Sequence, residues 1–430
     1  MISTAFINIW NKRVGAIAWD DEKRMASFEY EPAFLANNWD LAPLKMPVIG
    51  AGKQVFSFPE LRNTSTFKGL PGLIADVLPD KYGNGLINAW LASNGRPADS
   101  MNPVELLCFI GKRGMGALEF EPVLPKTNKG ATKIELNSLI HIAQEILLGK
   151  IDFNTSLSSD EAKALSDILK IGTSAGGARA KAVIAFNSET KEIRTGQADA
   201  PKGFTHWLLK FDGVTDQQLG TSSGYGRVEM AYYLMAQEAA IEMTECRLLE
   251  ENGRAHFMTK RFDREHEKEK LHVQSFCAIA HYDFNEITLF SYEQLFETMR
   301  SLLLPYTDAE QLYRRMVFNV MARNCDDHTK NFSFIMDKTG QWKLAPAFDV
   351  CHAYRPGSTW VSQHSLSVNG KRKDITRNDL LQVARKMNIK KAGAIIDQIH
   401  AAVGKWNEFA NQTHVKKDLR EAISKTLLFL

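Results

Sequence analysis

Residues 323–332 have the sequence RNCDDHTKNF, and residues 344–350 have the sequence LAPAFDV. Asp326 lies five residues before Asn331, and Asp349 follows about twenty residues later between two apolar residues. Phosphoryl transfer from ATP needs a carboxylate that orients the acceptor hydroxyl and oxygen ligands that hold Mg²⁺ against the phosphates. Mg²⁺ suits so small a ligand set because it keeps waters and uses the phosphates of its substrate. The spacing therefore predicts Asp326 as base and Asn331 and Asp349 as metal ligands.

This spacing alone leaves a structural alternative open. An Asp-Asp-His run can cap a helix or turn, and Asn331 can bond to nearby backbone groups. Asp349 weighs against that alternative, because a carboxylate in so apolar a context needs a compensating partner. We expect His328, inside the same loop, to brace Asp349 or the loop backbone rather than to transfer a proton. A zinc site is a further alternative, but the spacing of its candidate ligands fits no usual zinc pattern: Cys325, His328, Cys351 and His352.

Composition indicates a soluble globular protein of two or three subdomains. The chain has 430 residues, of which 44% are hydrophobic and 24% charged, and a net charge of +3. So balanced a charge argues against a general nucleic-acid coat protein. We expect no secretion signal at the N-terminus, and no apolar run approaches the roughly 20 residues that span a bilayer. The five cysteines are scattered and form no CxxC motif, so we expect reduced thiols, a cytoplasmic location and no membrane contact.

The chain divides into three predicted parts. Residues 1–130 form a small α/β subdomain, residues 131–265 a nucleotide-binding lobe that contains a sheet, and residues 266–430 a helical catalytic lobe. A polar stretch at 125–130 is the predicted linker. Strands are expected at 5–10 and 14–19, around a turn at 11–13. Apolar spacing predicts helices at the following positions: 73–78, 86–91, 136–148, 228–242, 292–302, 309–322 and 379–387.

A glycine-rich stretch at 172–181, GTSAGGARAK, is a candidate phosphate-binding loop. Glycines let backbone N–H groups approach phosphate oxygens, and Arg179 or Lys181 adds positive charge. It is neither a Walker A loop nor the GxGxxG of eukaryotic kinases, and a glycine-rich surface turn is the alternative. Lys210 ends an apolar strand and could neutralise phosphates, or it could be a lysine at a strand edge whose ammonium reaches water. Glu229 could pair with Lys210 or merely favour the start of its helix.

Several motifs together resemble the HipA family of bacterial toxin kinases. DDHTKNFSF followed by LAPAFDV is similar to the catalytic signature of the family. Four other stretches resemble family elements in the order of the family, so that the matches run from about residue 7 to about residue 390: FEY at 28–30, GMGAL at 114–118, GGARAK at 176–181 and HSLSVNGK at 364–371.

The resemblance implies an α+β, bipartite HipA/protein-kinase-like fold, with a mixed α/β amino-terminal region, a mainly helical carboxy-terminal lobe and ATP in the cleft. It implies a serine/threonine kinase that is the toxin of a HipBA-like system and inactivates itself by autophosphorylation at Ser174, with the added charge expelling the loop. It also implies further nucleotide contacts: Gly176, Gly177, Ala178, Arg179, Lys181, Lys210, Lys260, Phe262 and His328. Lys260 stands where family members commonly carry Glu, although hinge contacts use backbone groups as well.

The resemblance also implies partners. These are a protein substrate, since the known targets of the family include aminoacyl-tRNA synthetases, and a HipB-like DNA-binding antitoxin that could dock on the amino-terminal subdomain. Residues 371–391 carry eight Lys and Arg against two Asp. This stretch is a solvated helix face or a contact for nucleic acid or an acidic partner.

Two other functions stay open at this point. One is a non-catalytic antitoxin-binding protein that acts only as a DNA corepressor, against which the intact Asp326, Asn331 and Asp349 argue. The other is a small-molecule phosphotransferase related to lipid kinases, which would use the same catalytic logic and differ only in its substrate.

Overall fold

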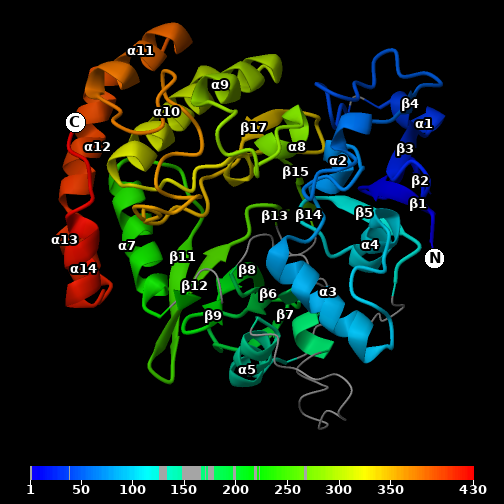
Figure 1. Cartoon of the computed structure of the whole chain (residues 1–430), viewed down its shortest axis with the longest axis horizontal. Helices are drawn as coiled ribbons and strands as arrows, with labels where there is room; N and C mark the ends of the chain where they lie inside the picture. The colour runs from blue at the N-terminus through cyan, green and yellow to red at the C-terminus, as the bar shows by residue number, and fades with distance from the viewer. Residues whose placement is uncertain are drawn as a thin grey trace. The chain divides into compact units, whose positions relative to one another are not determined.

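The computed structural model divides into two compact units. Unit 1 comprises residues 1–42, 46–223 and 249–273, and unit 2 comprises residues 43–45, 224–248 and 274–430. The structure describes residues 2–37, 39–124, 133–147, 166–169, 171–172, 179–196, 200–216, 220–221, 223–265 and 269–430. Figure 1 labels the elements of both units.

Unit 1 begins with an antiparallel sheet in the order β4-β3-β2-β1-β5. Its strands are β1 (Thr4–Ile9), β2 (Lys12–Asp20), β3 (Met25–Tyr30), β4 (Val55–Phe56) and β5 (Leu118–Glu121). The predicted strands at 5–10 and 14–19 are confirmed as the β1–β2 hairpin. Trp10 and Asn11 have φ of 47° and 64°, the left-handed conformation that two-residue hairpin turns require. In β1, buried side chains alternate with more exposed ones, as in a sheet with one covered face.

The helices of unit 1 are mostly short. They are α1 (Pro32–Leu35), α2 (Gly72–Ala75), α3 (Lys81–Ser93), α4 (Pro103–Ile110) and α5 (Leu136–Leu147), with a 3₁₀ turn, η1, at Pro59–Leu61. The helix predicted at 73–78 is the single turn α2, whereas those predicted at 86–91 and 136–148 are confirmed as α3 and α5. We did not predict α4, because all eight of its residues are buried and it has no amphipathic period.

A second sheet follows, in the order β11-β12-β8-β6-β7. Its strands are β6 (Lys181–Phe186), β7 (Ile193–Thr195), β8 (Thr205–Lys210), β11 (Cys246–Glu251) and β12 (Arg254–Lys260). Two short hairpins accompany it, β9 (Thr215–Asp216) with β10 (Gly220–Thr221) and β13 (Arg264–Glu265) with β14 (Glu269–Lys270). All six residues of β6 are buried, because this strand lies inside the sheet and its apolar side chains join a core that includes α3 and α5.

Unit 2 is mainly helical. Its helices are α7 (Tyr225–Glu238), α8 (Phe276–Ala280), α9 (Tyr292–Ser301), α10 (Tyr306–Met321), α11 (Arg377–Met387), α12 (Ala392–Gly404), α13 (Trp406–Gln412) and α14 (Lys417–Ser424). Strands β16 (Ser333–Met336) and β17 (Trp342–Leu344) pair antiparallel, and β15 (His272–Ser275) begins at the end of unit 1 and continues into unit 2. The helices predicted at 228–242, 292–302, 309–322 and 379–387 are confirmed as α7, α9, α10 and α11, with shifted ends. Capping boxes begin α9 and α11 and explain why their starts are well defined.

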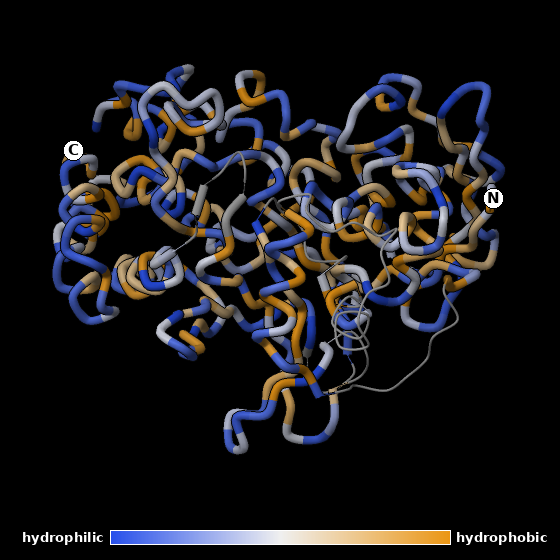
Figure 2. Tube along the Cα trace, turned by 60° about the horizontal axis from the view of Figure 1, so that its bottom comes forward, coloured by the Kyte–Doolittle hydropathy of each residue, from blue (hydrophilic) through white to orange (hydrophobic). Residues whose placement is uncertain are grey.

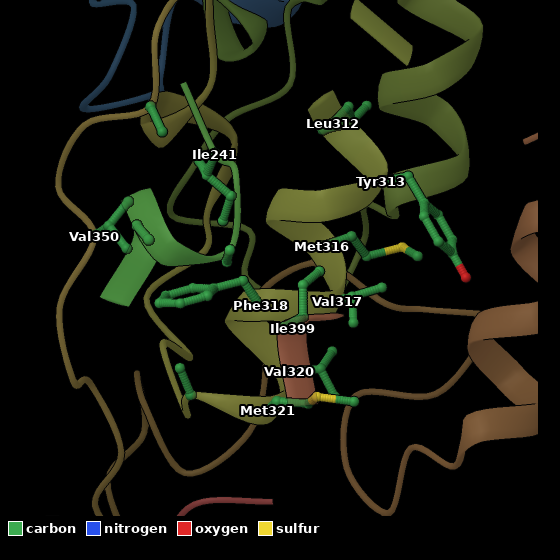
Figure 3. Close-up of a cluster of buried hydrophobic side chains, with 14 of the residues drawn as sticks. Ile241, Leu312, Tyr313, Met316, Val317, Phe318, Val320, Met321, Val350 and Ile399 are labelled. Atoms are coloured by element: carbon green, nitrogen blue, oxygen red, sulfur yellow. The ribbon is translucent and has the colours of Figure 1, made fainter. Parts of the chain in front are cut away.

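Helix α10 organises the core of unit 2. Figure 3 shows Val317 and Val320 of α10 beside Ile399 of α12, and Phe318 extending towards Ile241 and Val350. Each fully buried apolar side chain of this kind stabilises the fold by about 1.5–3 kcal/mol. Since Val350 follows Asp349 directly, this packing connects the helical core to a candidate site residue.

Hydrophobic and hydrophilic residues alternate along the elements in Figure 2. No helix in the described parts of the chain has the length and apolar character that a membrane-spanning segment requires.

Candidate active site

The loop that bears Asp326 follows α10 and is held by backbone pairing. The Cys325 N–H donates to the Ala353 carbonyl and the Ala353 N–H donates to the Arg323 carbonyl, both at 3.0 Å. Arg323 itself has a φ of +56°, which turns the chain out of the helix direction. The pairing lays the loop beside the segment that follows Asp349, so two stretches distant in sequence become neighbours.

Asp326 and Asn331 close this loop on itself. The Asn331 Nδ2 donates to the backbone carbonyl of Asp326 at 2.6 Å, and residues 329–331 form a 3₁₀ turn, η2 (Thr329–Asn331). The Asp326 side chain is 48% exposed, so its carboxylate is accessible to an incoming hydroxyl. Because the side-chain N–H of Asn331 is bound to that carbonyl, the side-chain oxygen of Asn331 faces away from it.

His328 braces the loop. Its Nδ1 accepts a hydrogen bond from the Lys330 N–H at 3.3 Å, and its Nε2 lies 3.8 Å from Asp326 Oδ1. The imidazole also packs on Phe284, with ring centroids 5.2 Å apart. These contacts match the expected bracing of the loop backbone.

Asp349 has a backbone conformation that is uncommon for a residue with a side chain. Its φ is +56°, in the left-handed region that Asp and Asn adopt more readily than most residues, and several turn residues of this chain share it. The backbone two residues before Asp349 is fixed by a hydrogen bond, because the Ala347 N–H donates to the Glu242 carbonyl at 2.8 Å. Asn331 and Asp349 line one pocket, together with these residues: Ile241, Arg315, Phe318, Asn319, Asn324, Asp327, Phe332, Ala347, Phe348 and Val350.

The residues of this pocket fit Mg²⁺ better than zinc. A carboxylate from Asp349 and an amide oxygen from Asn331 are hard oxygen donors, to which substrate phosphates and water would add the remaining ligands. In the described parts of the chain, no group of three or more His, Cys, Asp and Glu could hold a metal ion. Of the four residues considered for zinc, Cys325 instead contacts His364, and His352 contacts Thr426.

The cationic candidates lie in unit 1. Lys181 on β6 and Lys210 on β8 are directly opposed in the antiparallel register, so their side chains leave the same face of the sheet. Lys181 is buried, whereas Lys210 is half-buried with its ammonium 5.8 Å above the ring centre of Phe257. Arg179, at the start of this segment, is also half-buried.

The centre of the glycine-rich stretch lies outside the described residues. This applies to Ser174, Gly176, Gly177 and Ala178, whose assigned roles remain predictions. A Cβ at Gly172, just before them, would lie 2.4 Å from Leu86 Cδ1, so a larger residue there would require the Leu86 side chain to shift.

The hinge candidates lie at the end of β12. Lys260 is the last residue of that strand, opposite Trp207 of β8, and Phe262 is half-buried two residues later. Arg261 lies between these two residues in the chain, and Arg264 follows them. Both pair with the carboxylate of Asp263, which also accepts a hydrogen bond from the Gly116 N–H at 2.7 Å. We did not predict this buried cluster, although an Asp between two Arg in KRFDR was a signal for it.

A second feature that the sequence analysis missed is the role of Asp327. We treated Asp-Asp-His as one polar run, but Asp327 is fully buried and accepts hydrogen bonds from Tyr292, His364 and Ser365. Adjacent side chains in an extended loop point to opposite sides, so one acid of such a pair is expected to turn inward and need partners.

Comparisons with known proteins cover nearly the whole chain. Residues 5–121 match the family described as HipA N-terminal domain, and residues 173–406 match the HipA-like C-terminal domain. A stretch of 138 residues, 29% of this chain, is 28% identical to Y4mE of Sinorhizobium fredii, a protein named as a candidate kinase. That match covers 32% of the relative, so the chain spans about a third of the length of the curated relative it matches.

Solved structures give the fold. HipA of Shewanella oneidensis MR-1, solved with HipB and operator DNA, superposes with a TM-score of 0.67 at 15% identity, covering 98% of this chain and 94% of that one. The kinase CtkA of Helicobacter pylori matches with a TM-score of 0.32 at 14% identity, over 51% of this chain and 87% of that one. The fold match with HipA confirms the predicted α+β class.

Proposed function

Because this chain belongs to the HipA family, we propose that it transfers the terminal phosphoryl group of ATP to a serine or threonine hydroxyl of a protein, using Mg²⁺. Asp326 would orient the acceptor hydroxyl and accept its proton. Asn331 and Asp349 would hold Mg²⁺, which when bound neutralises charge on the phosphates. Lys210, Lys181 and the 172–181 loop would contact the phosphates, and Lys260 and Phe262 would lie near the base.

One observation carries this proposal. Asn331 and Asp349 line the same pocket, while Asp326, joined to Asn331 through its own carbonyl, keeps an accessible carboxylate. A helix cap or a surface turn would not by itself bring a second oxygen donor, Asn331, into the same pocket as Asp349. The arrangement supports Asp326 as the residue that meets the acceptor hydroxyl, and Asn331 and Asp349 as the residues that hold the metal.

The test is the intact mass of the protein after incubation with Mg-ATP. We expect one added phosphate in the wild type, none in Asp326→Asn, and none when EDTA removes the metal. Peptide mapping should locate the phosphate on Ser174, where its charge would favour release of the loop from the nucleotide. If the wild type neither gains phosphate nor consumes ATP with any protein substrate offered, the kinase proposal is wrong.

We also propose a HipB-like DNA-binding antitoxin as partner. The supporting observation is the fold match over 98% of this chain to a HipA that was solved with HipB and operator DNA. A HipB-like protein that co-purifies with the wild type and with Asp326→Asn alike would fit this partnership. If such a complex formed while ATP was never consumed, a non-catalytic corepressor would be favoured instead.

Substrate class is the other open choice. A protein substrate, with an aminoacyl-tRNA synthetase among the candidates, and a small-molecule substrate would use the same catalytic residues. Radiolabelled ATP with a cell extract, separated into protein and small-molecule fractions, distinguishes the two.

A further inference from the structure

Two consecutive acids of the candidate catalytic loop face in opposite directions. The Asp326 side chain is about half exposed, whereas that of Asp327 has no exposed surface. A carboxylate removed from water in this way costs several kcal/mol unless donors surround it. A buried charge therefore lies directly beside Asp326, the residue that would meet the acceptor hydroxyl.

The Asp327 carboxylate is bound by three donors from two separate segments. Its Oδ2 accepts from Tyr292 Oη at 2.8 Å and lies 2.9 Å from His364 Nδ1, and its Oδ1 accepts from the Ser365 N–H at 2.8 Å. Tyr292 begins α9, and the other two residues belong to the segment before α11. The loop is thus tied to two parts of unit 2 through one side chain.

A second set of hydrogen bonds leads back to the loop on the other side of Asp326. Asn319 of α10 donates from Nδ2 to Tyr292 Oη at 3.0 Å, and Asn324 donates from Nδ2 to Asn319 Oδ1 at 3.0 Å. Asn324 lies two residues before Asp326 and Asp327 one residue after it. The backbone of Asp326 is therefore held from both sides by one buried network.

The charge of this network is balanced internally. Burial by itself lowers the pKa of His364, but the Asp327 carboxylate outweighs burial and raises that pKa to about 10. His364 is then an imidazolium at neutral pH and forms a charge-assisted hydrogen bond, which is shorter and more directional than a neutral one.

We propose that Asp327, together with Tyr292 and His364, is a positioning residue that holds Asp326 and Asn331 in their reactive arrangement. This inference rests on the proposed kinase function. None of the three touches the reacting atoms in this assignment; they act through the loop backbone. A misplacement of about 1 Å at a reacting group can cost about 100-fold in rate, so loosening the network should lower kcat rather than nucleotide affinity.

A matched pair of substitutions separates positioning from stability. Tyr292→Phe removes the hydroxyl that donates to Asp327, whereas Tyr313→Phe removes an equally buried hydroxyl of the same unit that donates to the Leu380 carbonyl at 3.1 Å. Tyr292→Phe loses two buried hydrogen bonds, the one to Asp327 and the one from Asn319 Nδ2, and Tyr313→Phe loses one. We expect Tyr292→Phe to lower kcat about 10-fold at an unchanged KM for ATP, and Tyr313→Phe to leave both within about twofold.

Hydrogen exchange gives a readout that does not depend on activity. The amides of Cys325 and Asn331, which donate to Ala353 and His328, should exchange faster in Tyr292→Phe and unchanged in Tyr313→Phe. Unchanged exchange in both variants would overturn the positioning inference, whatever the activity. Faster exchange with an unaltered kcat in an active enzyme would also overturn it, leaving the kinase function intact. A wild type that consumes no ATP would instead refute the proposed function, and the positioning role of Asp327 in that function with it.

Discussion

His364 Nδ1 lies 2.9 Å from a carboxylate oxygen of Asp327, and both side chains are buried. Removal of one partner from such a pair leaves an uncompensated charge in the interior, which costs about 3–5 kcal/mol. Loss of either partner should therefore destabilise unit 2 and disturb the loop beside Asp326.

The stability of the protein should fall with rising pH because of His364. Its pKa is about 10 in the folded protein, above the value of about 6.5 for an unfolded chain. The contribution is complete below about pH 6.5 and declines by about 1.4 kcal/mol per pH unit until the folded-state pKa is passed. Urea unfolding of the wild type and of His364→Asn between pH 6.5 and 9.5 measures it. Parallel pH dependences for the two proteins would contradict this assignment.

Asp349→Ala should abolish activity at least as completely as Asp326→Ala. Loss of a general base typically costs about 10²–10⁴-fold, whereas electrostatic stabilisation of the transferred group usually contributes more. Single-turnover rates of phosphate transfer at saturating Mg-ATP are the measurement, with circular dichroism to verify folding. A nearly fully active Asp349→Ala would show that this residue is not a metal ligand.

Lys210→Met and Lys181→Met should weaken the binding of Mg-ATP. The two lysines are opposed on neighbouring strands, so an anion on that face of the sheet would be near both charges. We expect the rise in Tm on adding Mg-ATP to shrink in both variants. Lys202→Met, which removes an exposed lysine of the same unit, is the control and should retain the full rise. Equal rises in all three variants would place the phosphates elsewhere.

Asp263→Asn should destabilise unit 1 by about 3–5 kcal/mol. Burial tends to raise the pKa of Asp263, but Arg261 and Arg264 outweigh burial and hold that pKa well below its ordinary value. The contribution is therefore present above about pH 4 and lost as the pH falls through the depressed pKa. Thermal unfolding at pH 7 checks the substitution. Asp20→Asn, which breaks the surface pair with Lys23, is the control and should be nearly neutral.

Regular elements were the most predictable part of the fold. The β1–β2 hairpin and the helices α9, α10 and α11 follow from local apolar spacing and local caps, so their sequences contain most of the information. Helix α4 escaped prediction because all of its residues are buried, and α2 was predicted too long. The extents of both helices depend on the elements packed around them, and the spacing of apolar residues along the chain does not encode that packing.

The candidate site divides in the same way. The spacing of Asp326 and Asn331 indicated a closed loop, and the structure closes it through a hydrogen bond within six residues. Asn331 and Asp349 lie close to each other because the loop pairs with the 351–353 segment. The chemical roles of these residues remain predictions that the experiments above address.

By itself, the sequence determined the features that act over a few residues: the strands and helices, their caps, and the loop with an acid and an amide five positions apart. Only the tertiary structure decided which of two adjacent acids is solvent-accessible. Asp326 and Asp327 are chemically identical, and Asp327 is the buried one because Tyr292, His364 and Ser365, all distant in sequence, supply its hydrogen-bond donors. A buried carboxylate requires such partners, and only folding brings them together.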